Sequence, residues 1–193
     1  MDSLIAIIGT STAIVALAEI GDKTMLLAVL LAARFRQPLQ VMAGILIATL
    51  ANHALAAWAG VALAGWLAGP WFQAGVGLGF LAMAVWTLVP DTMDTPPATS
   101  GRQALLVTTL AFFVVEIGDK TQIATVALGA RFQDVAAVTI GTTLGMMLAN
   151  GPAVLLGERM LKLVPLVLVR RVAAALFALL GLLILVQISW VAG

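Results

Sequence analysis

The sequence has no cysteine and a single histidine among its 193 residues. Without cysteine, neither disulfide bonds nor thiolate metal sites are available, and one histidine argues against a dedicated zinc or copper site. Charged residues are also scarce, at 10% of the chain, and the net charge is +1 with no basic run. A protein without a basic stripe is not expected to bind nucleic acid.

What the sequence has in abundance is apolar side chains, which make up 62% of the residues and give a mean hydropathy of +1.12. Soluble globular proteins contain roughly 45–50% apolar and about 25% charged residues, so this chain cannot cover its own surface in water. We therefore expect an all-α integral membrane protein that shares its core with the lipid bilayer. The first apolar stretch is too long for a signal peptide and follows no positive region, so we expect it to remain in the mature protein.

Six segments of the chain are long and apolar enough to be transmembrane helices, each of which needs about 20 residues. They are predicted near residues 4–33, 38–68, 72–90, 103–130, 134–157 and 166–190. The first and the fourth segment exceed one crossing, so a tilt or a break is expected in each. Lysine and arginine gather in loops on one side, which places both termini outside (periplasmic) and the longest loop in the cytoplasm.

The sequence repeats itself without a gap at an offset of 97 residues. Glu-Ile-Gly-Asp-Lys-Thr occurs at 19–24 and again at 116–121, and about 15 of the 42 positions from 19 to 60 are identical in the second copy. Each copy holds three spans, so the second must enter the membrane from the opposite side, as in the inverted repeats of many secondary transporters. A duplicated scaffold without a transport role is the alternative. We predict two three-helix repeats and a cytoplasmic linker, at 1–90, 103–193 and 91–102.

Each motif places two acids and a lysine near the middle of a predicted span, where a charge costs roughly 2.5–3.5 kcal/mol. The six residues are Glu19, Asp22, Lys23, Glu116, Asp119 and Lys120. Such residues face the bundle interior and by default mark an ion or proton pathway. On an unbroken helix, the i, i+3 and i+4 spacing puts each set on one face. A break at Gly21 or Gly118 would instead free backbone carbonyl oxygens as further ligands.

Four carboxylates and two ammonium groups carry a formal charge of −2 if the two motifs meet in one site. One divalent cation or two protons would neutralise that charge, so metal and protons would compete for the same carboxylates. Oxygen ligands suit Mg²⁺, Ca²⁺ or Mn²⁺. The alternative is an ion pair between the glutamate and lysine of each motif within its own helix, but both aspartates then remain uncompensated in a low dielectric.

Polar residues near the motifs are candidates for supporting roles. Gln122 offers a further hard oxygen, whereas its counterpart Met25 would favour Mn²⁺ over Ca²⁺ if its soft sulfur faced the site. His53 and its counterpart Asn150 are predicted in mid-span, either as donors to the acids, with His53 as a proton relay, or as interhelical hydrogen-bonding groups. The other supporting candidates are the motif residues Lys23, Thr24, Lys120 and Thr121.

The paired motif closely resembles the signature Glu-x-Gly-Asp-(Lys/Arg)-(Thr/Ser) of uncharacterised protein family 0016. The resemblance covers nearly the whole chain, and both copies match at every signature position. Eukaryotic members of that family are Golgi cation/proton antiporters that handle Ca²⁺ and Mn²⁺, and bacterial members are manganese exporters. The resemblance implies Mn²⁺ export across the inner membrane in exchange for protons, with the cation bound by Glu19, Asp22, Glu116 and Asp119.

Two other functions remain open, namely Ca²⁺/H⁺ antiport and a passive divalent-cation channel lined by an acidic ring. An enzyme is not expected, because the sequence contains no His-Glu-x-x-His, Gly-x-Ser-x-Gly or other nucleophile–base set. The expected partners are the divalent cation, protons and the lipid bilayer, with no resident cofactor. The sequence makes no prediction of the oligomeric state.

Overall fold

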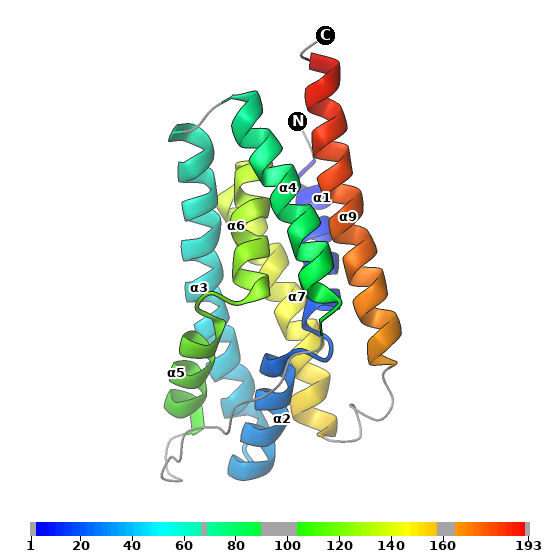
Figure 1. The fold of residues 1–193 in the computed structure, drawn as a ribbon. Helices are drawn as coiled ribbons and strands as arrows, with labels where there is room; N and C mark the ends of the chain where they lie inside the picture. Colours follow the sequence, from blue (N-terminus) through cyan, green and yellow to red (C-terminus); the bar gives the residue numbers. More distant parts are fainter. Residues whose placement is uncertain (1–2, 67–68, 90–103, 158–164, 192–193) are drawn as a thin grey trace.

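The computed structural model describes residues 3–66, 69–89, 104–157 and 165–191. These residues form eight α-helices and no strand, which confirms the prediction of an all-α protein. The helices are α1 (Leu4–Glu19), α2 (Lys23–Phe35), α3 (Pro38–Trp66), α4 (Pro70–Thr87), α5 (Ala104–Glu116), α6 (Lys120–Phe132), α7 (Val135–Leu156) and α9 (Leu166–Val191). Figure 1 shows one elongated bundle, in which α2 and α5 lie at the end opposite to the start of α1 and the end of α9.

The predicted segments correspond to these helices within a few residues. Four of them are the single helices α3, α4, α7 and α9, and the first and fourth are each broken in two, at residues 20–22 and 117–119. α1 and α2 meet at a bend of 71°. The break is thus present at the expected place. The single helical face predicted for Glu19, Asp22 and Lys23 is wrong, because the first helix ends at Glu19.

Three helices in the described part of the chain, α3, α7 and α9, are long and apolar enough to cross a membrane. The bent pair of α1 and α2 makes a fourth if it counts as one span, and α4 and α5 are apolar but shorter. The described residues therefore provide three to four candidate spans and do not confirm six. The breaks are one reason, since they leave α1 with 16 residues and α5 with 13, where a crossing needs about 20.

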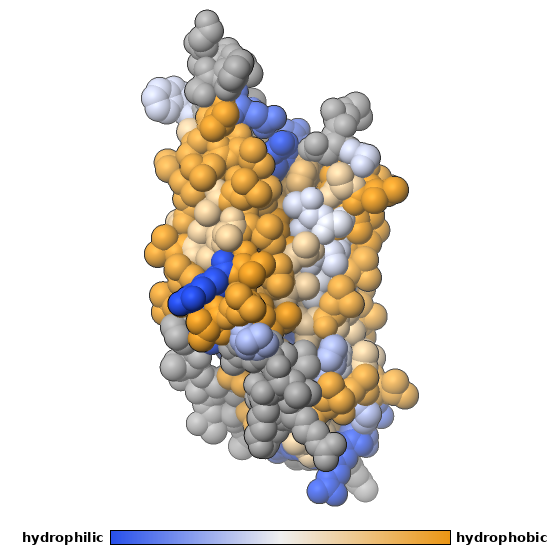
Figure 2. Space-filling model, turned by 90° about the vertical axis from the view of Figure 1, so that its right-hand side faces the viewer, coloured by the Kyte–Doolittle hydropathy of each residue, from blue (hydrophilic) through white to orange (hydrophobic). Residues whose placement is uncertain are grey.

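The surface of the bundle is rich in apolar side chains. Hydrophobic residues cover most of the face shown in Figure 2, and large side chains such as Trp58, Leu148 and Leu182 are more than half exposed. Soluble monomers rarely expose so much contiguous apolar surface. In a bundle with helices of this length, the lipid bilayer is the environment that such a surface fits.

The two halves of the chain pack into each other. α1 packs on α7, α5 packs on α3, and α4 packs on α9. Between α4 and α9, the fully buried rings of Phe80 and Phe177 have their centroids 6.2 Å apart. These two residues occupy equivalent positions in the sequence repeat, 97 residues apart. Equivalent side chains of the two copies therefore meet in the core.

α3 and α6 approach each other with backbone against backbone. A methyl group at Gly60 would overlap the carbonyl oxygen of Val126, and one at Gly129 would overlap the carbonyl oxygen of Ala57. Glycine at helix contacts allows this close approach. α6 begins directly after Asp119, so this contact fixes the helix that follows the second acidic motif.

Candidate metal centre

Each acidic motif lies at a break between two helices and follows the same backbone course in both copies. The glutamate ends one helix, and the glycine two residues later takes the left-handed conformation, with φ of 83° at Gly21 and 75° at Gly118. Residues with a side chain rarely adopt this conformation. The aspartates, Asp22 and Asp119, are the N-caps of α2 and α6, yet their side chains make no capping hydrogen bond. Their carboxylates are therefore used elsewhere.

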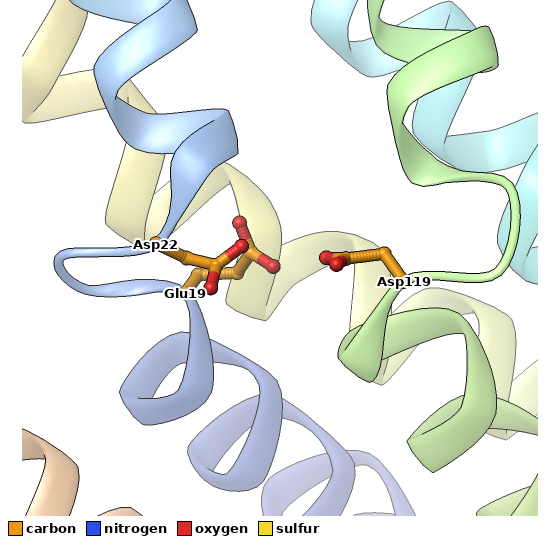
Figure 3. Close-up of side chains that lie close together, drawn as sticks. All are labelled: Glu19, Asp22 and Asp119. Atoms are coloured by element: carbon orange, nitrogen blue, oxygen red, sulfur yellow. The ribbon is translucent and has the colours of Figure 1, made fainter. Parts of the chain in front are cut away.

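Three carboxylates from the two motifs converge in the interior. One oxygen from each of Glu19, Asp22 and Asp119 lies within 4.8 Å of the other two, and each residue is at most 3% exposed. Figure 3 shows Glu19 and Asp22 together, with Asp119 facing them from the other copy. Glu19 Oε1 and Asp119 Oδ2 are buried and have no hydrogen-bond partner among the described residues. Carboxylate oxygens are the kind of ligand that divalent cations such as Ca²⁺ and Mn²⁺ prefer, so this acidic cluster is a candidate site for such an ion.

The ends of the broken helices add to the electrostatics of the acidic cluster. α2 and α6 begin directly after Asp22 and Asp119, so the positive ends of two helix dipoles lie beside these carboxylates. This arrangement reduces the cost of holding them ionised in the interior. α1 and α5 end at the glutamates of the two motifs. In secondary transporters, the ends of discontinuous helices bind substrates and coupling ions.

Two lysines cross between the motifs. Lys23 Nζ lies 2.8 Å from Asp119 Oδ1, and Lys120 Nζ lies 3.3 Å from Asp22 Oδ1. Each lysine thus pairs with the aspartate of the other copy, whereas the within-helix alternative paired it with the glutamate of its own motif. The two pairs are buried to different degrees, since the side chain of Lys120 is 4% exposed and that of Lys23 is 31% exposed.

Glu116 is completely buried but is not a member of the acidic cluster. Its Oε2 atom lies 3.6 Å from Nε2 of His53, which is fully buried on α3. Neither carboxylate oxygen of Glu116 accepts a hydrogen bond from the part of the chain that the structure describes. The structure therefore brings three of the four predicted carboxylates together and leaves the fourth beside His53.

The threonines and the asparagine predicted to support the site differ in their relation to the cluster. Thr24 Oγ1 donates a hydrogen bond to Glu19 Oε2 and so supports a cluster member directly. Thr121 is buried as well. Asn150 Nδ2 donates to the carbonyl oxygen of Met146 at 3.1 Å, one turn earlier in α7. Thr24 therefore bonds directly to the cluster, whereas the amide group of Asn150 is used within its own helix.

Gln122 and its counterpart Met25 both have other neighbours. Gln122 Oε1 accepts a hydrogen bond of 2.6 Å from the backbone N–H of Gly118, so this oxygen closes the break instead of extending toward the cluster. Met25 is fully buried and clusters with Val29 and Ala153. In the structure, the amide oxygen of Gln122 thus has a hydrogen-bonding role, and the sulfur-bearing side chain of Met25 has a packing role.

Two contacts near the motifs have little or no signal in the sequence. Asn52 Nδ2 donates to the carbonyl oxygen of Phe113 at 3.1 Å, which joins α3 to α5 near Glu116. Its position next to the mid-span histidine is a weak signal. Lys120 Nζ lies 6.0 Å from the ring centroid of Trp86 on α4. No local pattern predicts this contact, because the two residues are far apart in the sequence.

A cavity of about 180 Å³ lies apart from the acidic cluster. Its lining comes from α3, α4, α6 and α9 and includes Gln73, Arg131 and Gln187. Arg131 Nη2 donates a hydrogen bond of 3.4 Å to Gln187 Oε1. No residue of either acidic motif lines this cavity, so it is not part of the candidate metal centre.

The chain is similar to known transporters over most of its length. The family model described as "Divalent cation/proton antiporter GDT1" matches residues 7–95 and 104–190. A curated protein of Vibrio cholerae serotype O1, named "Putative manganese exporter", is 48% identical over 182 residues, which are 94% of this chain and 91% of the relative. No solved structure matches. Both names describe transporters and not enzymes, and together with the apolar helices they indicate an integral membrane protein. The chain belongs to the GDT1 family of divalent cation/proton antiporters.

Proposed function

We propose that this protein exports Mn²⁺ from the cytoplasm in exchange for protons, with Glu19, Asp22 and Asp119 as ligands of the transported cation. The observation that carries the proposal is the convergence of these three buried carboxylates within 4.8 Å. Removing an ionised carboxylate from water costs several kcal/mol unless the charge is compensated. A set of three therefore needs more positive charge than the two lysines supply.

Charge balance links the cation to the protons. The four buried carboxylates and the two lysines of the motifs carry a formal charge of −2. One divalent cation or two protons neutralise this charge, so each occupant makes the site as neutral as the other does. Exchange follows because the two occupants compete for carboxylates in the same interior.

The choice of Mn²⁺ over Ca²⁺ rests on the relative and not on the ligands. Three carboxylates suit either ion, since both accept oxygen ligands. The name of the Vibrio cholerae protein favours manganese, and 48% identity over nearly the whole chain makes a shared substrate a reasonable proposal. Export as the direction comes from the same name.

We also propose six spans arranged as two inverted repeats, 1–90 and 103–193, in the cell inner membrane with both termini outside. The crossed pairs of Lys23 with Asp119 and Lys120 with Asp22 support this arrangement, since a two-fold axis between the halves would generate one pair from the other. The contact between the equivalent rings of the core supports it as well. In this arrangement, α1 with α2 and α5 with α6 are two broken spans.

The test is a flux measurement on purified protein in liposomes. Vesicles that are acidic inside should accumulate Mn²⁺ as protons leave, and Asp119→Asn should abolish this uptake. Arg36→Gln is the matched control, because it removes an exposed charge at the position where the second copy carries Gln133. Mn²⁺ flux that ignores the pH gradient would contradict antiport and favour a passive channel, and uptake of Ca²⁺ in preference to Mn²⁺ would change the assigned ion.

A further inference from the structure

We propose that Lys23 and Lys120 are tethered counter-cations, which hold Asp119 and Asp22 in the empty carrier and are displaced when the divalent cation binds. The inference rests on the proposed function and gives a role to two side chains that are not among the proposed metal ligands. The lysines keep their positive charge throughout, and the competition is for position beside the carboxylates.

The aspartates are shared between the acidic cluster and the lysine pairs. Asp119 contributes an oxygen to the cluster while its Oδ1 atom lies 2.8 Å from Lys23 Nζ, and Asp22 does the same with Lys120 Nζ at 3.3 Å. Two unit charges 4 Å apart interact by about 4 kcal/mol at an effective dielectric constant of 20. A divalent ion at the acidic cluster would repel each ammonium group about twice as strongly as a single charge does, which weakens the hold of each lysine on its aspartate.

The structure offers each lysine an alternative position away from its aspartate, and the two positions differ. The side chain of Lys23 is 31% exposed, so its ammonium group has room to move away from Asp119 Oδ1 while it stays beside the site and its stem stays packed. Lys120 is 4% exposed, but its Nζ atom already lies 6.0 Å from the ring centroid of Trp86, within the range of a cation–π contact. The position equivalent to Trp86 in the second copy is Leu183. Trp86 therefore offers Lys120 an aromatic ring as an alternative partner, whereas the equivalent residue of the other copy, Leu183, cannot offer one to Lys23.

Displacement explains how a buried acidic site can release its cation. When the ion leaves, the returning ammonium groups compensate Asp22 and Asp119, which would otherwise be buried charges without a partner at a cost of several kcal/mol. The same competition lowers the affinity for the ion. A site of carboxylates alone would hold a divalent cation more tightly and would exchange it more slowly.

The first test measures Mn²⁺ binding to the purified protein at a fixed pH by equilibrium dialysis. Lys120→Gln removes one competitor and should lower the Kd for Mn²⁺ by about tenfold, which corresponds to about 1.4 kcal/mol. Lys120→Arg keeps the charge and should stay close to the wild-type Kd. Trp86→Leu removes the aromatic ring that Lys120 would contact after displacement and should raise the Kd severalfold. Arg36→Gln is again the matched control and should leave the Kd unchanged.

A second test follows the lysines in the wild-type protein, so it does not depend on the folding of any variant. The chain has three lysines, and mass spectrometry can follow the modification of each by a water-soluble amine reagent. Saturating Mn²⁺ should increase the rate at which Lys23 is modified by at least about threefold, because its partly exposed ammonium group is released from the ion pair with Asp119. Lys162 serves as the internal reference.

Unchanged or weaker Mn²⁺ binding by a stably folded Lys120→Gln would overturn the proposal, since the lysine would then only hold Asp22 in position. An unchanged modification rate of Lys23 would overturn it as well. Failure of the proposed function gives a different result: Glu19→Gln would then bind Mn²⁺ as well as the wild type does, and both proposals would fall. If Glu19→Gln abolishes binding while the lysine tests fail, only the inference on the lysines is wrong.

Discussion

The two copies of the acidic motif have the same six residues and nearly the same backbone, but their side chains meet different neighbours. In the first copy, Glu19 belongs to the acidic cluster and accepts a hydrogen bond from Thr24, and Lys23 is partly exposed. In the second copy, Glu116 lies beside His53 outside the cluster, and the lysine is buried. Identical motifs in a duplicated protein therefore need not have identical roles, because residues elsewhere decide what each carboxylate meets.

Substitutions at three pairs of equivalent positions accompany this difference between the copies. At each pair, the two copies carry unlike residues, of which at least one belongs to or contacts a motif or directly follows it. The pairs are His53 and Asn150, Trp86 and Leu183, and Met25 and Gln122. The asymmetry of the site therefore arises from residues outside the six-residue motifs. It can be tested by changing the motif residues and their neighbours separately.

The largest difference between the copies is expected at the two glutamates. Glu19→Gln removes a ligand from the acidic cluster and should weaken Mn²⁺ binding by more than about 100-fold, or about 2.7 kcal/mol. Glu116→Gln removes a charge outside the cluster and should weaken binding by less than about tenfold, since only the longer-range attraction is lost. Equilibrium dialysis of the two purified variants measures both values.

Both glutamine variants should still insert in the membrane, because a neutral amide is cheaper to bury than an ionised acid. Immunoblots of the membrane fraction provide that control. Equal losses of Mn²⁺ affinity at positions 19 and 116 would mean that the two copies contribute equally, and the asymmetric description of the site would then be wrong.

A smaller effect is expected at the two glycines of the breaks. Gly21→Ala and Gly118→Ala each force a side chain into the left-handed region at a cost of about 1–2 kcal/mol. Gly21 is buried, whereas Gly118 is exposed and a methyl group there would meet nothing within 4 Å. Gly21→Ala should therefore lower the Tm in detergent more than Gly118→Ala, for which a decrease of about 2–8 °C is expected.

Gly9→Ala is the matched control for the two glycine variants. Gly9 lies inside α1, and a methyl group there also has open space. Because alanine is favoured over glycine in a helix by roughly 0.5–1 kcal/mol, this variant should keep or raise the Tm. A decrease as large as that of Gly118→Ala would show that the left-handed conformation is not the cause.

The smallest effect is expected from Gln122→Met, which gives the second copy the residue of the first. It removes the hydrogen bond that Gln122 accepts from the exposed Gly118 N–H, at a cost of about 0.5–1.5 kcal/mol. Mn²⁺ transport in liposomes should be retained, since the amide oxygen is hydrogen-bonded to Gly118 and is not one of the proposed ligands. The reverse change, Met25→Gln, should cost about 1–3 kcal/mol because it buries an amide without a designed partner. Loss of Mn²⁺ transport in a stable Gln122→Met protein would make Gln122 a ligand after all.

The helices could be predicted from the sequence because they depend on local patterns, and the approach of the two motifs could be predicted from the internal repeat and the cost of charges in lipid. Pro38 begins α3 and Gly157 ends α7, as turn-forming residues at the ends of apolar runs predict. The glycine within each motif indicated a break. The position of Glu116 could not be predicted, because it depends on His53 in another helix, and no spacing rule states which buried acids meet. The crossed lysine pairs likewise join residues of different copies.

The number of spans was harder to predict for a different reason. Hydropathy adds up over a window and does not detect where the backbone stops being helical. The breaks at 20–22 and 117–119 leave the apolar content of the first and fourth segments unchanged but divide each into two short helices. Because α4 is short as well, three helices in the described part of the chain qualify by length, or four with the bent pair.

Genetic screens of this protein should find positions 60 and 129 as sensitive as the acids themselves. Any side chain at Gly60 or Gly129 would push the backbones of α3 and α6 apart, and α6 is the helix that starts directly after Asp119. If the proposed Mn²⁺ export is correct, a strain with such a change should become sensitive to manganese although every proposed ligand is still encoded. Loss of growth therefore identifies a metal ligand only when direct binding data on the same variant accompany it.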